Sequence, residues 1–326
     1  MQVTRPGDAA LTGRFAAALD ALWPGFTTTA DLRLGLAVSG GPDSLALLVL
    51  AHAVLPGRIA AATVDHGLRA ESAAEAAMVA QLCRTLGVEH AVLPVTVAPG
   101  NVQAQARTAR YAALAAWAGK AGLAALATAH HADDQAETLL LRLNRGSGVA
   151  GLAGVRARGL VPGASLPLPL LRPLLGLRRA ELAQVVAATG LEPATDPSNE
   201  DDRFDRARLR KALGAAEWLE VPSLAASAAH LADADAALDW TAQREWAECV
   251  TRAPMGLTYR PQAPRAVALR VIARIVRELE SEEPRGSAIA RLFDSLLARE
   301  TASIGALVAR VTPDGWSFSK APTRRT

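Results

Sequence analysis

Cysteine is almost absent from this chain, which has only Cys83 and Cys249 among its 326 residues. Two cysteines so far apart in sequence cannot form a disulfide framework, a CxxC redox pair or a cysteine zinc cluster. The first residues lack the apolar stretch of a signal peptide. The longest apolar run, Leu45–Val54, contains His52 and is far shorter than a membrane span. We therefore expect a cytoplasmic protein that does not contact a membrane.

Lysine and aromatic residues are also scarce. Only Lys120, Lys211 and Lys320 are lysines, so 32 of the 35 cationic residues are arginines. Arginine suits phosphate and base-edge recognition better than lysine does, although a composition rich in arginine and alanine is equally typical of a GC-rich genome. With 4% aromatic residues, base stacking would depend on a few side chains such as Trp218 or on arginine planes. The chain is mildly basic, with a net charge of +3, and its 50% hydrophobic content permits a sizeable core.

The first two thirds of the chain alternates short apolar runs with amphipathic stretches, which predicts strands and helices in turn. The expected strands are Leu32–Val38, Arg58–Val64, His90–Val97 and Leu123–Thr128. The expected helices are Asp43–Leu55, Glu71–Leu86, Val102–Lys120 and Ala132–Asn144. This order predicts an α/β fold with a doubly wound, mostly parallel sheet, in which ligands bind at the C-terminal ends of the strands.

Beyond about residue 215 the apolar spacing becomes helical. The expected helices there are Leu224–Cys249, Ala266–Leu279 and Ile289–Leu297, and the turn signal Thr312–Gly315 predicts a small hairpin between Ala306–Val311 and Trp316–Phe318. We therefore expect a catalytic domain over residues 1–215 and a smaller, mainly helical domain over residues 216–326.

The first expected strand runs directly into a glycine-rich segment that opens the first helix, Ser39-Gly40-Gly41-Pro42-Asp43-Ser44. Paired glycines allow a tight turn and close approach of a ligand, while serine hydroxyls and the free N–H groups of a helix N-terminus attract anions. These features predict a cradle for a phosphate chain. Asp43 would repel that anion unless a cation lay between them, which suggests Mg²⁺. The GxxxxGKS/T and GxGxxG loops are absent, and an ordinary glycine-rich turn is the alternative.

The stretch between Thr138 and Ala180 has no acidic residue and seven arginines, which are Arg142, Arg145, Arg156, Arg158, Arg172, Arg178 and Arg179. Its glycines and prolines indicate that much of it is loop. Seven unpaired arginines cannot be buried. The stretch is therefore either a solvated surface or a contact for a polyanion.

The Ser39–Ser44 segment resembles the PP-loop of the ATP pyrophosphatase superfamily, whose members cleave ATP to AMP and pyrophosphate while activating a carbonyl oxygen. Further segments narrow the choice: Val64–Arg69 (VDHGLR), Ala106–Tyr111 (ARTARY), His130–Thr138 (HHADDQAET), Arg172–Leu175 (RPLL), Asp196–Asn199 (DPSN) and Arg206–Arg210 (RARLR). Their order and spacing are similar to the N-terminal domain of the bacterial tRNA(Ile)-lysidine synthetase family, over about residues 30–212. Ala207 departs from the family pattern, since members often have Asn there.

This resemblance implies a reaction in two steps. ATP adenylates the C2 carbonyl of the wobble cytidine in tRNA(Ile) with a CAU anticodon, and the ε-amine of free L-lysine then displaces AMP to form lysidine. The implied partners are tRNA(Ile), L-lysine, ATP and Mg²⁺. The oligomeric state stays open, with a homodimer as one alternative.

The resemblance also implies roles at the ATP site. The six residues Ser39–Ser44 would bind ATP together with His66 and Arg107. Arg107 and Mg²⁺ would neutralise the α-phosphate. Asp43 and Asp133 would hold the Mg²⁺.

For the second step, the lysine amine must be bound as a cation and then lose a proton. We assign Asp134 and Glu137 to this amine, one of them serving as base, with Asp133 as the third member of the acidic cluster. A solvated acidic first turn of a helix is the alternative. The neighbouring His130 and His131 are expected to hydrogen-bond backbone or phosphate, with metal ligation less favoured.

Further residues are expected to contact the tRNA or lysine, namely Arg142, Arg145, Asn199, Arg206 and Arg210. Arg206 and Arg210 lie four residues apart, so a helix would present both guanidiniums on one face. Their alternative role is salt bridging to Asp201, Asp202 and Asp205.

Three other functions remain open. A PP-loop thiolase such as 2-thiocytidine synthetase needs paired cysteines or an iron–sulfur cluster, which two isolated cysteines disfavour. A small-molecule PP-loop ligase would not need the arginine-rich stretch. A non-catalytic nucleotide-binding module would leave the acidic cluster and the Arg206/Arg210 pair without a role.

Overall fold

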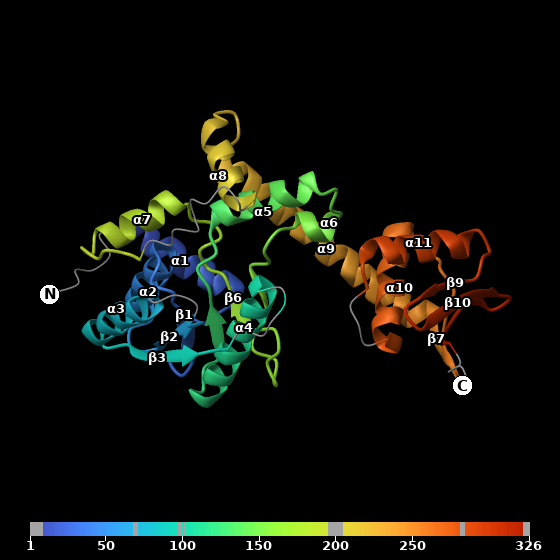
Figure 1. Ribbon diagram of the computed structural model, residues 1–326, viewed down its shortest axis with the longest axis horizontal. Helices are drawn as coiled ribbons and strands as arrows, with labels where there is room; N and C mark the ends of the chain where they lie inside the picture. Colours follow the sequence, from blue (N-terminus) through green and yellow to red (C-terminus); the bar gives the residue numbers. More distant parts are fainter. Residues whose placement is uncertain are drawn as a thin grey trace. The chain divides into compact units, whose positions relative to one another are not determined.

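The structure is a computed structural model that describes residues 9–67, 71–96, 100, 102–194, 205–280 and 284–321. The chain divides into two compact units, Met1–Ala232 and Asp233–Thr326, and the boundary falls within helix α9 (Val221–Cys249) (Figure 1). None of the helices in the described ranges is long and apolar enough to cross a membrane.

The first unit is built around a six-stranded sheet in the order β3-β2-β1-β4-β6-β5. Its strands are β1 (Leu34–Ala37), β2 (Ile59–Asp65), β3 (Glu89–Pro94), β4 (Ala125–Ala127), β5 (Arg158–Leu160) and β6 (Pro169–Leu171). All neighbouring pairs are parallel except β5 and β6. The strand order reverses between β1 and β4, and such a switch point is where open α/β sheets bind ligands.

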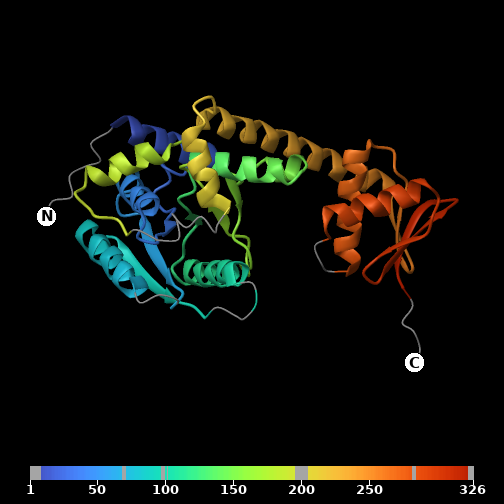
Figure 2. The ribbon, with the colours of Figure 1, turned by 45° about the horizontal axis from the view of Figure 1, so that its top comes forward.

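Helices cover both faces of this sheet (Figure 2). They are α1 (Ala9–Leu22), α2 (Pro42–Val54), α3 (Glu71–Leu86), α4 (Val102–Lys120), α5 (Ala132–Asn144), α6 (Val149–Leu152), α7 (Arg179–Ala187) and α8 (Asp205–Ala215). Apolar residues of α1, α2, α3 and α7 share one core cluster with the sheet, whereas Tyr111, Leu114 and Ala118 of α4 pack in a second cluster.

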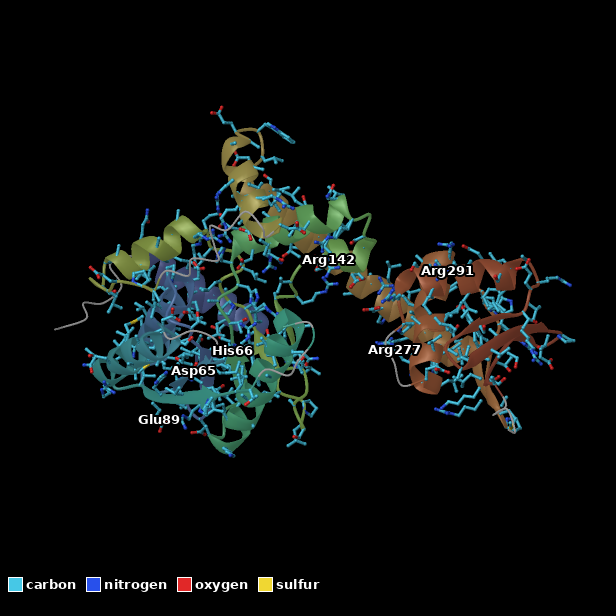
Figure 3. The ribbon with its side chains drawn as sticks, viewed as in Figure 1. Asp65, His66, Glu89, Arg142, Arg277 and Arg291 are labelled. Carbon is cyan, nitrogen blue, oxygen red and sulfur yellow. The ribbon has the colours of Figure 1, made fainter. Side chains whose placement is uncertain are left out.

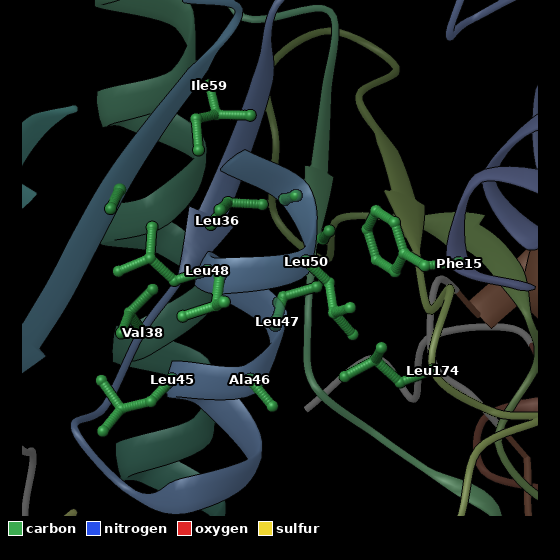
Figure 4. Packing of buried hydrophobic residues seen from close by; sticks show 14 of the residues in the cluster. Phe15, Leu36, Val38, Leu45, Ala46, Leu47, Leu48, Leu50, Ile59 and Leu174 are labelled. Carbon is green, nitrogen blue, oxygen red and sulfur yellow. The ribbon is translucent and has the colours of Figure 1, made fainter. Parts of the chain in front are cut away.

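Buried apolar side chains pack against both faces of the sheet at its centre. Figure 4 shows Leu45, Leu47 and Leu48 of α2 packed beside Leu36 of β1. Helix α2 is apolar on all sides because it lies within this core, as expected for a fully buried helix. A Cβ atom at Gly35 in β1 would come within 2.5 Å of Leu126 Cδ2, so the side chains on this face need a glycine there.

The second unit contains a five-stranded antiparallel sheet in the order β7-β8-β11-β10-β9. Its strands are β7 (Val250–Ala253), β8 (Gly256–Tyr259), β9 (Ala302–Ile304), β10 (Leu307–Thr312) and β11 (Gly315–Lys320). Helices α10 (Arg265–Glu280) and α11 (Gly286–Leu297) place buried residues such as Ile272 and Phe293 in a core with Phe318 of β11.

The predicted α/β class and mostly parallel sheet are confirmed, and so are the helices expected after residue 215 and the closing hairpin, formed by β10 and β11. The second unit holds more strand than the expected mainly helical domain, because β7, β8 and β9 extend the hairpin into a sheet. These strands have only three or four residues each, too few for a clear alternating pattern.

Candidate active site

The phosphate loop, residues 39–41, joins β1 to the N-terminus of α2 at the switch point of the sheet. Gly40 has φ +91°, a conformation that L side chains rarely adopt, and a Cβ atom there would lie 3.3 Å from Met78 Cε. A Cβ atom at Gly41 would have only Ser39 Oγ nearby, at 3.8 Å. The backbone conformation and the packing against Met78 therefore require a glycine at position 40. Gly41, by contrast, leaves the space in front of the helix N-terminus open.

Two serines and a distant backbone amide hold this loop in place. Ser44 Oγ donates to the carbonyl of Gly41 at 2.9 Å and accepts the N–H of Ser39 at 3.1 Å. The N–H of Ala194, which follows α7, donates to the carbonyl of Gly40 at 3.0 Å. Within the described residues no side chain caps α2, so the first N–H groups of the helix remain available to an anion.

His131, the residue before α5, is fully buried and links the phosphate loop to the acidic cluster. Its Nε2 lies 3.4 Å from Asp43 Oδ2 and 3.6 Å from Asp134 Oδ2, while its Nδ1 lies 3.6 Å from Asp133 Oδ2. Burial alone would lower the pKa of His131, but the surrounding carboxylates outweigh it and raise the pKa to about 9. A buried cation thus stands between three carboxylates at neutral pH.

Asp133 is held on the side of His131 away from the phosphate loop. Arg178 donates to both carboxylate oxygens at 3.2 Å, and the N–H of Arg179 donates at 2.8 Å. Burial alone would raise the pKa of Asp133, but His131, this N–H and Arg178 together hold it well below its usual value. The carboxylate of Asp133 is thereby fully occupied by protein donors.

Glu137 has a side chain only 2% exposed, and it lies between two arginines from other helices. Arg210 of α8 donates through Nε to Oε1 at 3.0 Å, and Arg179 Nη2 of α7 lies 3.5 Å from the same oxygen. Asp134, by contrast, accepts a single hydrogen bond within the described residues, which comes from the backbone N–H of His131 at 3.0 Å. Of the two acids expected to bind an amine, Asp134 is the more accessible one.

A cluster of three arginines lies around Tyr111 of α4. The guanidiniums of Arg107 and Arg110 stand 5.0 and 5.4 Å from the centre of the Tyr111 ring. Arg172, directly after β6, also interacts electrostatically with Tyr111. Burial lowers the pKa of Arg110 and of Arg172. We call Arg107, Arg110, Arg172 and Tyr111 the arginine cluster.

Two histidines flank this cluster at the ends of β2 and β4. Burial lowers the pKa of His130 to about 4, and the three arginines act in the same direction, against Asp134. His130 Nδ1 lies 2.9 Å from Thr128 Oγ1, which fixes the ring. His66 lies next to Asp65 at the end of β2 (Figure 3). Burial, followed by the charge of Arg110, lowers its pKa. Both histidines are therefore neutral.

The remaining predicted contacts lie at the far end of α5 and on α8. Arg142 is exposed and forms no ion pair within the described residues (Figure 3). Arg145 pairs with Asp205 of α8 at 2.9 Å. Arg206 is exposed on α8, and Asn199 lies outside the described residues. On the same helix Ala207 is buried and Arg210 is half-buried.

Sequence reasoning missed part of this site. Arg110 belongs to a predicted motif but received no role, and His131 was expected to hydrogen-bond backbone or phosphate, whereas its ring lies among three carboxylates. Arg178 and Arg179 were grouped with the arginine-rich stretch, although they pair with the acidic cluster. The signal that could have found them was charge balance, because buried carboxylates require cations nearby.

Asp43 is suited to a magnesium ion. Its Oδ1 is buried without a hydrogen-bond partner in the described part of the chain, so an oxygen ligand is available at the phosphate loop. No group of three or more His, Cys, Asp and Glu side chains in that part could form a metal site. The free carboxylate oxygen of Asp43 fits Mg²⁺, which is usually bound by one or two carboxylates with water and substrate phosphates.

The two cysteines of the chain, Cys83 and Cys249, are both buried free thiols. Cys83 is buried in α3, and burial raises its pKa to about 12. Cys249 is buried in the second unit, at the end of α9. Neither thiol is poised to act as a thiolate at neutral pH.

A phosphate loop of this form at the switch point of a parallel sheet defines a PP-loop nucleotide-binding domain, and residues 14–217 match the family model of the PP-loop domain. Sequence relatives identify the family more narrowly. The chain is 48% identical to the tRNA(Ile)-lysidine synthase of Novosphingobium aromaticivorans, over 90% of each chain. It is 38% identical to that of Zymomonas mobilis, again over 90% of each. The chain belongs to the tRNA(Ile)-lysidine synthase family, as its motifs predicted.

Among solved structures, the U34-tRNA thiolase NcsA from Methanococcus maripaludis, determined with its 4Fe–4S cluster, has a similar fold. The TM-score is 0.55 at 15% identity, covering 67% of this chain and 77% of that one. At this identity the similarity concerns the fold alone.

Proposed function

We propose that this protein ligates free L-lysine to C2 of the wobble cytidine in tRNA(Ile) with a CAU anticodon. ATP is consumed, and AMP, pyrophosphate and lysidine are the products. The observation that carries the proposal is the placement of the acidic start of α5 beside the phosphate loop, with His131 Nε2 3.4 Å from Asp43. The phosphate loop, where ATP would activate the cytidine, thereby lies next to the acidic residues that would bind the lysine amine.

ATP would bind across the switch point. Its phosphates would take the N–H groups of the phosphate loop and the hydroxyls of Ser39 and Ser44, and its nucleoside would lie toward His66 at the end of β2. Asp43 would hold Mg²⁺, which when bound offsets phosphate charge. Asp133, the other carboxylate predicted for the metal, is tied to Arg178, so we favour Asp43 as the only protein carboxylate on the ion.

In the first step the C2 carbonyl oxygen of the cytidine attacks the α-phosphorus, and pyrophosphate leaves. Arg107, with Arg110 beside it, would stabilise the negative charge that develops on the α-phosphate. The protonated His131 would hold Asp43 and Asp134 together and limit their repulsion of the incoming anions.

In the second step the ε-amine of lysine attacks C2 and AMP leaves. Asp134 would bind the ammonium and take its proton, because it is the less occupied of the two acids predicted for this role. Glu137 remains a second candidate for the amine, although here it binds Arg179 and Arg210.

The proposal extends to the whole chain. We assign ATP and lysine chemistry to residues 1–215, and contact with the body of the tRNA to residues 216–326 in addition to the arginines of α5 and α8, in a cytoplasmic enzyme. A thiolase reaction is disfavoured because both cysteines are buried, with raised pKa values. A nucleotide sensor would not need His131 and three carboxylates beside the phosphate loop.

The direct test is incubation of the protein with ATP, labelled lysine and tRNA transcripts. We expect label to enter tRNA(Ile) with a CAU anticodon and not the same transcript with a GAU anticodon. ATP binding without incorporation of lysine would support the sensor, and incorporation that ignores the anticodon would contradict the proposed substrate.

A further inference from the structure

Several backbone carbonyls around the phosphate loop are bound by donors of the protein itself. The carbonyls of Gly40 and Gly41 accept the hydrogen bonds described above, from a backbone N–H and a serine hydroxyl. The carbonyl of Val38, directly before the loop, accepts Thr63 Oγ1 at 2.8 Å. A carbonyl oxygen repels a phosphate, so these bonds leave the approach to the loop to N–H groups, which attract it.

Thr63 of β2 acts where the backbone pairing of β1 and β2 stops. The last pair in register is Ala37 with Ala62, and the N–H of Val38 still donates to the carbonyl of Ala62 at 2.9 Å. The hydroxyl of Thr63 then binds the carbonyl of Val38. Because the side chain of Val38 is packed in the core (Figure 4), these two bonds fix the direction in which the chain leaves the sheet.

A histidine of the neighbouring strand completes this arrangement. His90 of β3 places its Nε2 2.9 Å from Thr63 Oγ1. A carbonyl can only accept, so the Thr63 hydroxyl donates its proton to Val38 and accepts the N–H of His90. Burial lowers the pKa of His90, and the charge of Arg84 acts in the same direction, so the ring is neutral and its single proton lies on Nε2.

Packing alone does not explain a threonine at position 63. The side chain is 4% exposed, and the other buried residues of the strand, Ile59–Ala62, are all apolar. Valine has nearly the same shape and is equally suited to a strand. A hydroxyl is costly to bury unless hydrogen bonds replace those it makes to water, so its presence here indicates that these hydrogen bonds have a use.

We propose that Thr63 and His90 are positioning residues for the phosphate chain of ATP. They hold the carbonyl of Val38 within the sheet, and the N–H groups of the phosphate loop then face the phosphates. Both residues act through Val38 and need not touch ATP. The inference rests on the ATP binding of the proposed function, and it adds two residues that lie outside the predicted motifs.

The test replaces Thr63 with valine, which keeps the shape of the side chain and removes its hydroxyl. We expect Thr63→Val to bind ATP roughly 3- to 10-fold more weakly in titration calorimetry, the usual effect of one hydrogen bond. Inorganic pyrophosphate should weaken by the same factor as a competitor of ATP, because the loop binds the phosphate chain. Thr63→Ser keeps a hydroxyl and should bind both as the wild type does.

Thr189→Val is the matched control. Thr189 is also buried, at 7% exposed, and its hydroxyl donates to the carbonyl of Val186 in α7 at 2.6 Å. This variant loses a comparable hydrogen bond, so it should unfold at a lower temperature and keep its affinity for ATP. An equal loss of ATP affinity in Thr189→Val would show a general effect of stability and overturn the inference.

His90→Leu is the second variant, at a position that is only half-buried. It removes the N–H that orients the Thr63 hydroxyl and should weaken ATP binding in smaller measure, even if Thr63→Val fails to fold. His90→Gln keeps an N–H and should restore the binding. Unchanged ATP affinity in folded Thr63→Val, or in His90→Leu if only that variant folds, overturns the inference.

Weaker binding of ATP with unchanged binding of pyrophosphate also overturns it, because Thr63 would then act on the nucleoside through His66 at the end of the same strand. None of these measurements uses lysine or tRNA. Lysidine formation can therefore fail in its own test while this inference stands, and the reverse holds as well.

Discussion

At the scale of single residues, Gly40 and Gly41 have different reasons to be glycine. Gly40 adopts φ +91° against Met78, whereas a side chain at Gly41 would enter open space. Gly41→Val should therefore fold normally and lose ATP binding. Gly40→Val should be destabilised by roughly 1–3 kcal/mol from backbone strain. Titration calorimetry with ATP and thermal unfolding of both variants will check this. Normal ATP affinity in folded Gly41→Val would remove the phosphate-loop assignment.

Asp134 and Glu137 can be separated by the two half-reactions. Asp134→Asn should keep tRNA-dependent exchange of pyrophosphate into ATP, because the phosphate loop and Arg107 are intact. Lysidine formation should fall by about 10²–10⁴, since the variant loses both the charge for the ammonium and the base. If the exchange is lost as well, Asp134 belongs to the ATP site.

Glu137→Gln should act first on stability. The substitution leaves Arg179 and Arg210 facing a neutral amide at a buried position, and breaking a buried ion pair costs about 3 kcal/mol. The midpoint of thermal unfolding should fall by several degrees, in contrast to Asp134→Asn. An unchanged midpoint with a loss of lysidine formation would return Glu137 to the amine site.

At the scale of elements, α5 carries its acids in the first turn and its arginines at the other end, as the helix dipole favours. Arg142 has no ion pair in the described part of the chain, while Arg145 is partly neutralised by Asp205. Arg142→Ala should weaken tRNA binding and lower the salt slope of log K by about 0.7–0.9 for each phosphate that the protein no longer binds. Arg145→Ala should lower it less, and ATP affinity should not change. Equal slopes for the wild type and Arg142→Ala would make Arg142 a solvated surface residue.

The elements were also where prediction from sequence worked best. The helices Glu71–Leu86, Val102–Lys120 and Ala132–Asn144 have the predicted bounds, because their apolar residues recur with a clear helical period. Helices α1 and α7 were not predicted, and neither were the short strands β5 and β6. Three-residue strands such as these have no period to detect.

At the site, the motifs could place Asp43, His66 and Asp134 at the C-terminal edge of the sheet, because each follows a predicted strand. The sequence could not show that Arg178 would bind the carboxylate of Asp133, or that Arg210 would bind the carboxylate of Glu137. These pairs join residues 45 and 73 positions apart, and they depend on how α7 and α8 pack against α5. Charge pairing over such separations is set by tertiary structure and not by local pattern.

At the scale of the whole molecule, each unit has a hydrophobic core of its own. Ile272→Ala removes a fully buried side chain in the second unit and should cost about 2–5 kcal/mol there. Scanning calorimetry should show one unfolding transition shifted to lower temperature, with ATP affinity unchanged. Leu48→Ala, in the core of the first unit, should shift the other transition. A single transition that moves in both variants would show that the units unfold together.

The hydrogen bond from Ala194 to Gly40 has a consequence for how the protein is made. It joins positions about 150 residues apart, and α7, which precedes Ala194, packs in the same core as α2. Ribosomes add roughly 5–20 residues per second, so a nascent chain waits about 8–30 s between making the glycine loop and making its partner. The nucleotide site is therefore completed only when nearly all of the first unit has been synthesised. A nascent chain that ends before Ala194 lacks the hydrogen bond that this residue makes to Gly40, so we expect it to hold the glycine loop less firmly than the finished chain does.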